Sequence, residues 1–168
     1  WVRPKTNPTY KYIVSKYDGG VAGSYKIDVR WNNKIEFSVE SPYSSMESNT
    51  ALESDKWSYV VATFDGKDKK IYINGLLDKS EAGGGLNSHT RPVLVGAALQ
   101  NGSPTEFFYG AIDDVRIYNY ARTPDEIRLD YNAGFAARFG PTSSCSEDPG
   151  ACMTQGLVGY WDFEEGAG

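Results

Sequence analysis

The sequence predicts an all-β fold, an antiparallel β-sandwich with one short helix close to its C-terminal end. Most of the chain consists of short runs rich in β-branched and aromatic residues, and clusters of Gly, Asn and Asp separate these runs. One segment, which begins at Thr123, carries the start signals of a helix. Short strands at regular spacing are typical of sandwiches and not of α/β proteins.

The first half of the chain predicts a strand followed by a hairpin. Residues 10–17 (YKYIVSKY) form a strand that ends at an Asp-Gly-Gly turn. Residues 24–31 and 34–41 each alternate in side-chain character. Asn32 and Asn33 lie between them and tolerate the positive φ angles of a tight turn, so these residues predict a β-hairpin.

The middle of the chain continues in the same way. Residues 57–64 (WSYVVATF) predict a strand that stops at an Asp-Gly turn, and residues 70–74 (KIYIN) predict the next one. Gly75 turns the chain into another short strand. Further strands are expected over residues 91–96 and 107–120, which completes the set needed for two sheets.

The helix is predicted from its capping residues. The four residues from Thr123 to Glu126 (TPDE) form a capping box with Pro at the first helical position. Ile127 and Tyr131 lie four residues apart and form a small apolar face. We expect the helix to stop at Gly134.

The character of the sequence changes after the helix. Residues 140–155 are small, polar and rich in Pro and Gly, which predicts a linker. Cys145 and Cys152 bracket a polar loop, and a disulfide between them, formed in an oxidising compartment, is the favoured interpretation. Two free thiols are the alternative. Residues 156–168 (GLVGYWDFEEGAG) predict a further strand.

Several of these segments, in this order, resemble the laminin-G-like (concanavalin-A-like) jelly-roll family of exported, multi-module bacterial proteins. The similar pieces are WVRP at residues 1–4, WSYVVATFDG at 57–66 with IYING at 71–75, LVG at 94–96 and GAIDDVRIYNYARTPDEI at 110–127. The resemblance extends to about residue 132. It implies a jelly roll over residues 1–139 that lacks its first strands, and an extracellular or cell-surface location.

Residues 156–168 depart from the order of that family, whose members open with a strand like GLVGYWDFEEGAG. A tandem array, in which these residues begin a following copy, is the simplest account. A circular rearrangement, in which Leu157–Phe163 pairs into the gap left by the missing first strand, is the alternative. Either way, an unpaired sheet edge predicts strand complementation, within the chain or with a neighbouring copy of the module.

Charge and hydropathy limit the partners. The 168 residues carry a net charge of −5, which repels phosphate backbones, so nucleic acid is not an expected partner. No apolar run approaches the roughly 20 residues that cross a bilayer, so no membrane contact is expected either. The composition, 40% hydrophobic and 14% aromatic, is that of a folded domain.

The acidic residues do not predict an enzyme. Asp162 and Glu164 alternate in sequence and could share one face of a strand, as carboxylates do in sandwich-fold glycoside hydrolases. The third carboxylate of that pattern is missing, and the opening strand of the resembled family normally ends in acidic residues and Gly. Asp113 and Asp114 are adjacent, so they should point to opposite faces of a strand and cannot form a catalytic pair.

Asp113 is the candidate metal ligand. It is expected to share the core-facing side of its strand with Val115 and Ile117, where a carboxylate needs hydrogen bonds or a cation. Fixation by backbone amides is the favoured interpretation and a structural Ca²⁺ site is the alternative, with no cofactor required. Asp114 and Arg116 should form a surface ion pair worth little.

Four residues are candidates for ligand binding: Trp31, Tyr43, Asn101 and Tyr109. Sugars are held by aromatic faces together with amide and carboxylate groups, and these four are expected on loops or outer faces. Trp57 and Trp161 are expected to pack in the core instead.

The functional prediction combines the fold with these candidates. It is a non-catalytic recognition or adhesion module that binds glycan or a surface polymer, within the kind of exported protein that the family resemblance implies. A purely structural spacer repeat and an accessory domain of a carbohydrate-active enzyme are the alternatives, because fold does not imply function.

Overall fold

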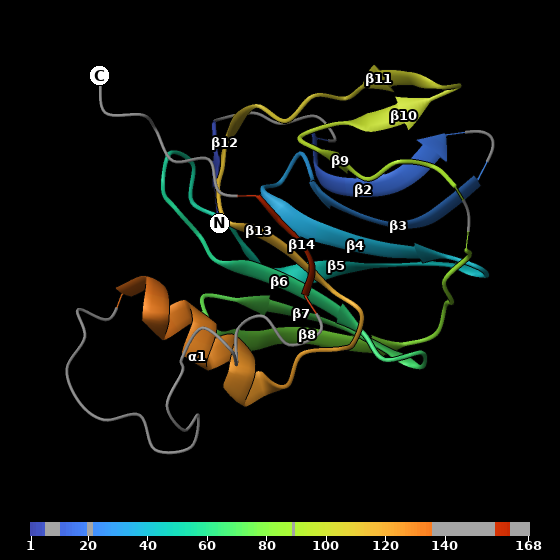
Figure 1. Ribbon diagram of the computed structural model, residues 1–168. Helices are drawn as coiled ribbons and strands as arrows, with labels where there is room; N and C mark the ends of the chain where they lie inside the picture. The colour runs from blue at the N-terminus through green and yellow to red at the C-terminus, as the bar shows by residue number, and fades with distance from the viewer. Residues whose placement is uncertain (6–10, 20–21, 89, 136–156, 162–168) are drawn as a thin grey trace.

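The computed structural model describes residues 1–5, 11–19, 22–88, 90–135 and 157–161. They form two layers of β-strands, with a helix beside the second layer (Figure 1). Side chains from both layers meet in one hydrophobic core. The predicted all-β sandwich is therefore confirmed.

The first layer is a seven-stranded sheet with the order β11-β10-β2-β3-β4-β5, and β9 also pairs with β2. Neighbouring strands are antiparallel except β10 and β2, which are parallel. The strands are β2 (Lys11–Gly19), β3 (Ala22–Val29), β4 (Lys34–Glu40), β5 (Tyr43–Ala51), β9 (Leu94–Val95), β10 (Ala98–Gln100) and β11 (Ser103–Thr105).

In the described residues the second layer consists of three separate sheets. β6 (Val60–Phe64), β7 (Asp68–Ile73) and β8 (Leu76–Ala82) form an antiparallel sheet. β1 (Val2–Pro4) pairs with β12 (Gly110–Ile112), and β13 (Val115–Tyr118) pairs with β14 (Leu157–Trp161). An isolated bridge between Val2 and Ser58 joins β1 to the segment just before β6.

The predicted hairpin is confirmed as β3 and β4, which pair from Tyr25↔Val39 to Val29↔Ile35 around Asn33 at φ 60°. Alternate residues of the two strands face the core: Tyr25, Ile27, Val29, Ile35, Phe37 and Val39. Each fully buried aliphatic side chain of this set stabilises the fold by about 1.5–3 kcal/mol relative to exposure. The alternation leaves the other face of the sheet polar.

The turn between β7 and β8 packs against the helix. Asn74 has φ 51° and Gly75 has φ 78°, the positive angles that a two-residue hairpin turn requires. A Cβ on Gly75 would also lie 2.9 Å from a ring carbon of Tyr131 on the helix. Glycine is therefore needed here both for the turn and for the close approach of the helix.

Helix α1 (Pro124–Phe135) begins as the capping box predicts. The amide of Thr123 donates to Glu126 Oε2 at 2.7 Å, and the amide of Glu126 donates to Thr123 Oγ1 at 3.3 Å. Ile127 is fully buried. The described helix extends to Phe135, one residue past the expected Gly134.

The segment Leu157–Trp161 pairs antiparallel with β13, with Trp161 opposite Val115 and Leu157 opposite Tyr118. This confirms the predicted strand pairing within the chain over these residues. The predicted linker, residues 140–155, lies outside the described residues. Whether residues 156–168 begin a following copy remains a prediction.

The position of Trp57 is a correction. It was expected in the core, but its side chain is 42% exposed, and the Arg3 guanidinium lies 5.2 Å from its ring centroid. The strand begins three residues later, at Val60. Trp57 therefore lies before the strand whose alternate residues face the core. Its amphipathic ring packs against a cation at the surface.

Candidate functional site

The outward face of the seven-stranded sheet carries an unusual concentration of charged and aromatic groups. We call it the polar sheet face. It comprises Tyr12, Tyr17, Lys26, Asp28, Arg30, Glu36, Ser38, Glu40, Tyr43, Ser45 and Glu47, which alternate with the core residues of β2–β5. Several of these side chains are buried although they lie on the outside of the sandwich, Asp28 at 1% and Lys26 at 9% exposure.

Strand register aligns these residues in rows across the sheet. Tyr12 pairs with Asp28, Asp28 with Glu36, and Glu36 with Glu47, so three carboxylates lie side by side on β3, β4 and β5. Directly opposed residues on one face have Cβ atoms about 4.5–5.5 Å apart. Like charges at that spacing repel, so the row needs a counter-charge.

Arg30 supplies that charge. Its guanidinium lies 3.2 Å from Glu36, 3.9 Å from Asp28 and 4.0 Å from Glu47. Both carboxylate oxygens of Asp28 are buried and accept no hydrogen bond from the described residues. Burial, followed by the neighbouring Glu36, raises the pKa of Asp28 to about 7. The row is thus only partly satisfied from within the chain.

The next row is centred on Lys26. Its ammonium lies 4.4 Å from the ring centroid of Tyr17 and 5.8 Å from those of Tyr12 and Tyr43. It forms no hydrogen bond or ion pair with the described residues, although its charge favours the ionised form of Glu40, whose pKa burial raises. The result is a cation surrounded by aromatic rings, with donor capacity left over.

A hollow of about 200 Å³ adjoins the polar sheet face between β2 and the β10–β11 hairpin. Tyr12 and Tyr17, stacked 6.3 Å apart, form one wall, and Gln100, Thr105 and Glu106 form the other. It is smaller than the pockets of about 300 Å³ or more that enclose drug-sized ligands. It suits one unit of a longer ligand that continues over the open face.

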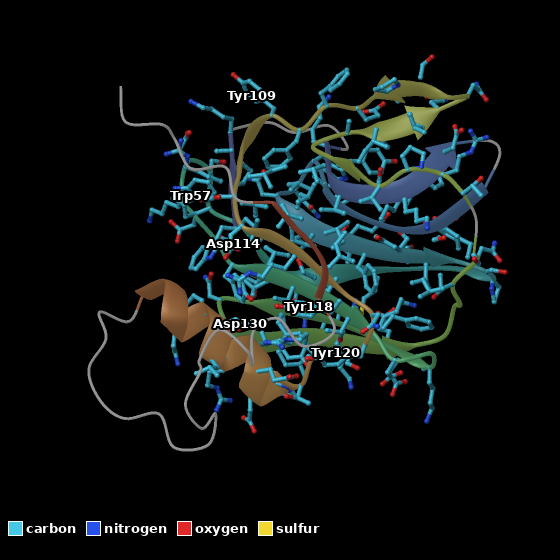
Figure 2. The ribbon with its side chains drawn as sticks, viewed as in Figure 1. Trp57, Tyr109, Asp114, Tyr118, Tyr120 and Asp130 are labelled. Carbon is cyan, nitrogen blue, oxygen red and sulfur yellow. The ribbon has the colours of Figure 1, made fainter. Side chains whose placement is uncertain are left out.

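The four predicted ligand-binding residues do not form one site. Tyr43, 58% exposed, lies on the polar sheet face beside Lys26. Asn101 lies in the β10–β11 turn that borders the hollow, and Trp31, 68% exposed, lies in the β3–β4 turn. Tyr109 precedes β12 in the second layer, and Figure 2 shows it near β12.

The sequence analysis did not identify the polar sheet face. The available signal was the run of charged residues at alternate positions of the predicted hairpin, namely Lys26, Asp28, Arg30 and Glu36. Charged residues at alternate positions of a strand usually form the solvent-exposed face of a sheet. Only the pairing register shows that they join with Glu47 and the tyrosines of β2.

The geometry at Asp113 corrects the expected strand alternation. Asp113 and Asp114 lie between β12 and β13, and Asp114 has φ 51°, so the two residues do not occupy opposite faces of one strand. Asp113 Oδ1 accepts the backbone amide of Asp114 at 2.7 Å, as the favoured interpretation expects. The described residues contain no group of three His, Cys, Asp or Glu side chains placed to hold a metal.

The pair formed by Asp114 and Arg116 is more buried than predicted. Two guanidinium nitrogens of Arg116 lie 2.8 Å from the two carboxylate oxygens of Asp114, and the side chains are only about one fifth exposed. Figure 2 shows Asp114, Tyr118 and Asp130 gathered between β13 and α1. This bidentate pair belongs to the packing of the helix and not to a surface contact.

Other predicted residues lie outside the described part of the chain. These are Cys145, Cys152, Asp162 and Glu164. No helix in the described residues is long and apolar enough to cross a membrane.

Comparison with solved structures identifies similar folds. A protein from Bacteroides ovatus ATCC 8483 described as carbohydrate binding has a TM-score of 0.69 and 16% identity; the match covers 98% of this chain and 44% of that one. The CBM40 domain of a Ruminococcus gnavus IT-sialidase, bound to α2,3-sialyllactose, has a TM-score of 0.66 and 12% identity over 77% of this chain and 78% of that one.

The binding domain of Paraclostridial Mosquitocidal Protein 1 has a TM-score of 0.57 and 16% identity, over 80% of this chain and 36% of that one. This chain therefore spans less than half of that domain and of the Bacteroides ovatus protein. At such identities the likeness shows the shared fold. No relative was found among curated proteins.

The family is identified by a match of the sequence to a protein-family model. Residues 1–128 match Laminin_G_3, described as the concanavalin A-like lectin/glucanases superfamily. This match covers most of the chain and includes every segment that carried the resemblance. The chain belongs to the Laminin_G_3 family of concanavalin A-like domains.

Proposed function

We propose that this domain is a non-catalytic glycan-binding module and that the polar sheet face is its binding surface. The observation that carries the proposal is Lys26, a nine-tenths buried side chain among three tyrosine rings that forms no hydrogen bond with the described residues. A buried ammonium normally has a hydrogen-bonding partner. A ligand oxygen above the sheet would supply it.

The chemistry of the face fits hydroxyl-rich ligands. Saccharide hydroxyls need both acceptors and donors, which Glu36, Glu47 and Lys26 offer, and the C–H faces of a sugar ring pack against tyrosine rings. The carboxylates of Glu36, Glu40 and Glu47 are balanced by the cations of Lys26, Arg30 and Lys34, whose ammonium lies 3.9 Å from Glu47. The surface therefore suits neutral saccharides.

The similar structures support a binding role. They include a sialidase carbohydrate-binding domain in complex with a sugar and the binding domain of a toxin. The family name also covers glucanases, so a binding role is our proposal and not a consequence of membership. An extracellular or cell-surface location follows from the proposal, because polymeric glycans are found there.

The proposal is tested with a glycan array followed by titration calorimetry on the best neutral ligand. Tyr43→Ala should weaken binding about tenfold or more, through loss of a stacking ring. Tyr109→Ala is the matched control, because both tyrosines are 58% exposed and only Tyr43 lies on the polar sheet face. Lys26→Met should weaken binding further.

Absence of array binding would contradict the proposal. So would equal losses in the Tyr43 and Tyr109 variants, since that result would place the ligand elsewhere. Thermal unfolding of each variant checks that the fold is unchanged.

Two further proposals come from the sequence. One is a structural Ca²⁺ at Asp113, for which millimolar Ca²⁺ should raise the melting temperature. The other is a disulfide between Cys145 and Cys152, for which reduction and alkylation should add the mass of two alkyl groups only after a reductant is present. An unchanged melting temperature, or alkylation without reductant, would contradict them.

A further inference from the structure

Strand β5 carries two residues of the proposed binding surface, Tyr43 and Glu47, and it is the last strand of the seven-stranded sheet. One edge of β5 pairs with β4, and none of the described strands forms a ladder with its other edge. A strand at the edge of a sheet leaves a row of backbone amides and carbonyls without strand partners. Contacts other than strand pairing must therefore fix this edge of the binding surface.

Glu47 is the carboxylate of its row that a ligand can reach. Its side chain is 35% exposed, against 10% for Glu36 and 1% for Asp28. The Asn32 side-chain amide donates to Glu47 Oε1 at 3.0 Å, while Glu47 Oε2 lies 4.0 Å from Nε of Arg30, beyond hydrogen-bonding distance. Glu47 Oε2 can therefore accept a hydrogen bond from a ligand hydroxyl.

The ladder between β4 and β5 contains a bulge directly after Glu47. Residues 48–50 of β5 lie opposite Ile35 alone. A bulge bends its strand and changes the direction of the neighbouring side chains. On the side of β4, the Ser48 hydroxyl replaces the missing backbone partner, because it accepts the Ile35 amide at 3.0 Å. The direction of the Glu47 side chain therefore depends on how the bulge is held.

Asp78 of the second layer holds the other side of the bulge. Its two carboxylate oxygens accept the backbone amides of Asn49 at 2.6 Å and of Thr50 at 3.0 Å. In return, Asn49 Nδ2 donates to the Asp78 carbonyl at 2.7 Å. Asp78 lies on β8, which belongs to a different sheet, so these side chains connect the edges of the two layers. Hydrogen bonds to a carboxylate are stronger than those between neutral groups.

We propose that Asp78 is a positioning residue for ligand binding, because it fixes the bulge from the second layer and so directs Glu47 toward the glycan. This inference rests on the proposed function, since it assigns Asp78 a role in that same site. Asp78 acts through the bulge and does not itself touch the ligand. The binding surface of one layer thus depends on a carboxylate of the other.

A double-mutant cycle tests the proposal, with titration calorimetry on the neutral glycan that the array selects. Asp78→Ala should weaken binding about threefold or more, as expected for a residue coupled to a ligand contact. Glu47→Ala should also weaken binding. In the Glu47→Ala background, Asp78→Ala should have little further effect, because the side chain that Asp78 positions is already absent.

Asp65 provides a matched control. Its carboxylate also accepts two backbone amides, from Lys67 at 2.9 Å and from Asp68 at 2.7 Å, but it does so in the turn between β6 and β7. Asp65→Ala removes a comparable pair of hydrogen bonds and should leave the glycan affinity unchanged. A purely structural role of Asp78 would give the two variants the same affinity.

Hydrogen exchange followed by NMR adds a measurement that needs no ligand. In Asp78→Ala the exchange of the Asn49 and Thr50 amides should accelerate about tenfold or more, because both lose a charged acceptor. If Asp78→Ala does not fold, Asn49→Ala repeats the cycle. It removes only the return bond, at an exposed position, and its effect on affinity should likewise disappear in the Glu47→Ala background.

Additive losses in the cycle, or equal affinities of the Asp78 and Asp65 variants, would overturn this inference and leave the proposed function in place. Unchanged exchange of the Asn49 and Thr50 amides would also rule it out. If the unmodified chain binds no glycan, the proposed function and this inference fail together.

Discussion

Two clusters of arginine and carboxylate groups differ in how closely they are paired. Under the helix, Arg122 Nη2 lies 2.6 Å from Asp130, and its Nη1 lies 2.9 Å from the Tyr120 hydroxyl and 3.2 Å from Glu126. On the polar sheet face, Arg30 reaches three carboxylates at 3.2 to 4.0 Å. Both clusters are largely buried, so the difference lies in geometry and not in exposure.

The comparison separates a structural cluster from the proposed binding surface. The Arg122 guanidinium also lies 4.5 Å from the Tyr118 ring and joins β13 to α1, and every contact is short enough to act as a fixed connection. Burial raises the pKa of both Asp130 and Asp28, but Arg122 opposes the effect at Asp130, while Glu36 adds to it at Asp28. On the sheet face both carboxylate oxygens of Asp28 lack a hydrogen bond from the described residues, whereas under the helix one oxygen of Asp130 does.

The largest expected effect on stability comes from breaking the structural cluster under the helix. Arg122→Ala leaves Asp130 buried without its closest partner and should lower the free energy of unfolding by about 3–5 kcal/mol, measured by urea denaturation. Arg128→Ala is the control, because that side chain is 58% exposed and lies 3.9 Å from Asp125. It should change stability by less than about 0.5 kcal/mol. Similar losses in both variants would remove the distinction between the clusters.

The next effect tests the sheet-face cluster through pH. Asp28 has a folded pKa of about 7 against an ordinary value of 3.8. The folded state therefore retains this proton while the unfolded state loses it, and stability falls as the pH rises from about 4 to about 7. Asp28→Asn removes this loss and should stabilise the domain above pH 7 by up to about 4 kcal/mol relative to the wild type.

The comparison is made by urea denaturation at several pH values. The gain from Asp28→Asn should be smallest near pH 4 and should level off above about pH 7. Glu53→Gln, at a side chain that is 71% exposed, should show no such trend. A gain that does not depend on pH would mean that Asp28 is charged throughout this range.

The smallest effect concerns the start of the helix that carries the structural cluster. Thr123→Ala removes the side-chain oxygen that accepts the Glu126 amide and should cost about 1 kcal/mol. Thr50→Ala, at an exposed position on β5, serves as the control. If thermal unfolding shows equal shifts for both variants, the capping box does not contribute to stability.

Local sequence patterns were sufficient to predict the elements whose conformation depends only on neighbouring residues. The hairpin of β3 and β4, the turn at Gly75 and the capping box at Thr123 were all predicted, because turn and cap preferences act over a few neighbouring residues. The strands β5, β10 and β11 were missed. They are polar or very short, and they form because a neighbouring strand edge pairs with them.

The candidate site depended on relations that a linear pattern does not contain. Asp113 and Asp114 were assigned by strand alternation, but the positive φ of Asp114 interrupts the strand and brings Asp114 to Arg116. Both Tyr43 and Tyr109 were predicted to be aromatic residues on loops or outer faces, and the sequence could not tell them apart. In the structure they belong to different layers.

The sequence by itself determined the family, the β-sandwich and the capped helix, because each follows from residues that are neighbours along the chain or that recur in a fixed order. The tertiary structure alone decided that Asp28, Glu36 and Glu47 form one row and that Tyr43 lies beside Lys26. Both features arise from strand register and sheet order, which the packing of the whole core selects. A shift of one residue would move every side chain of a strand to the opposite face.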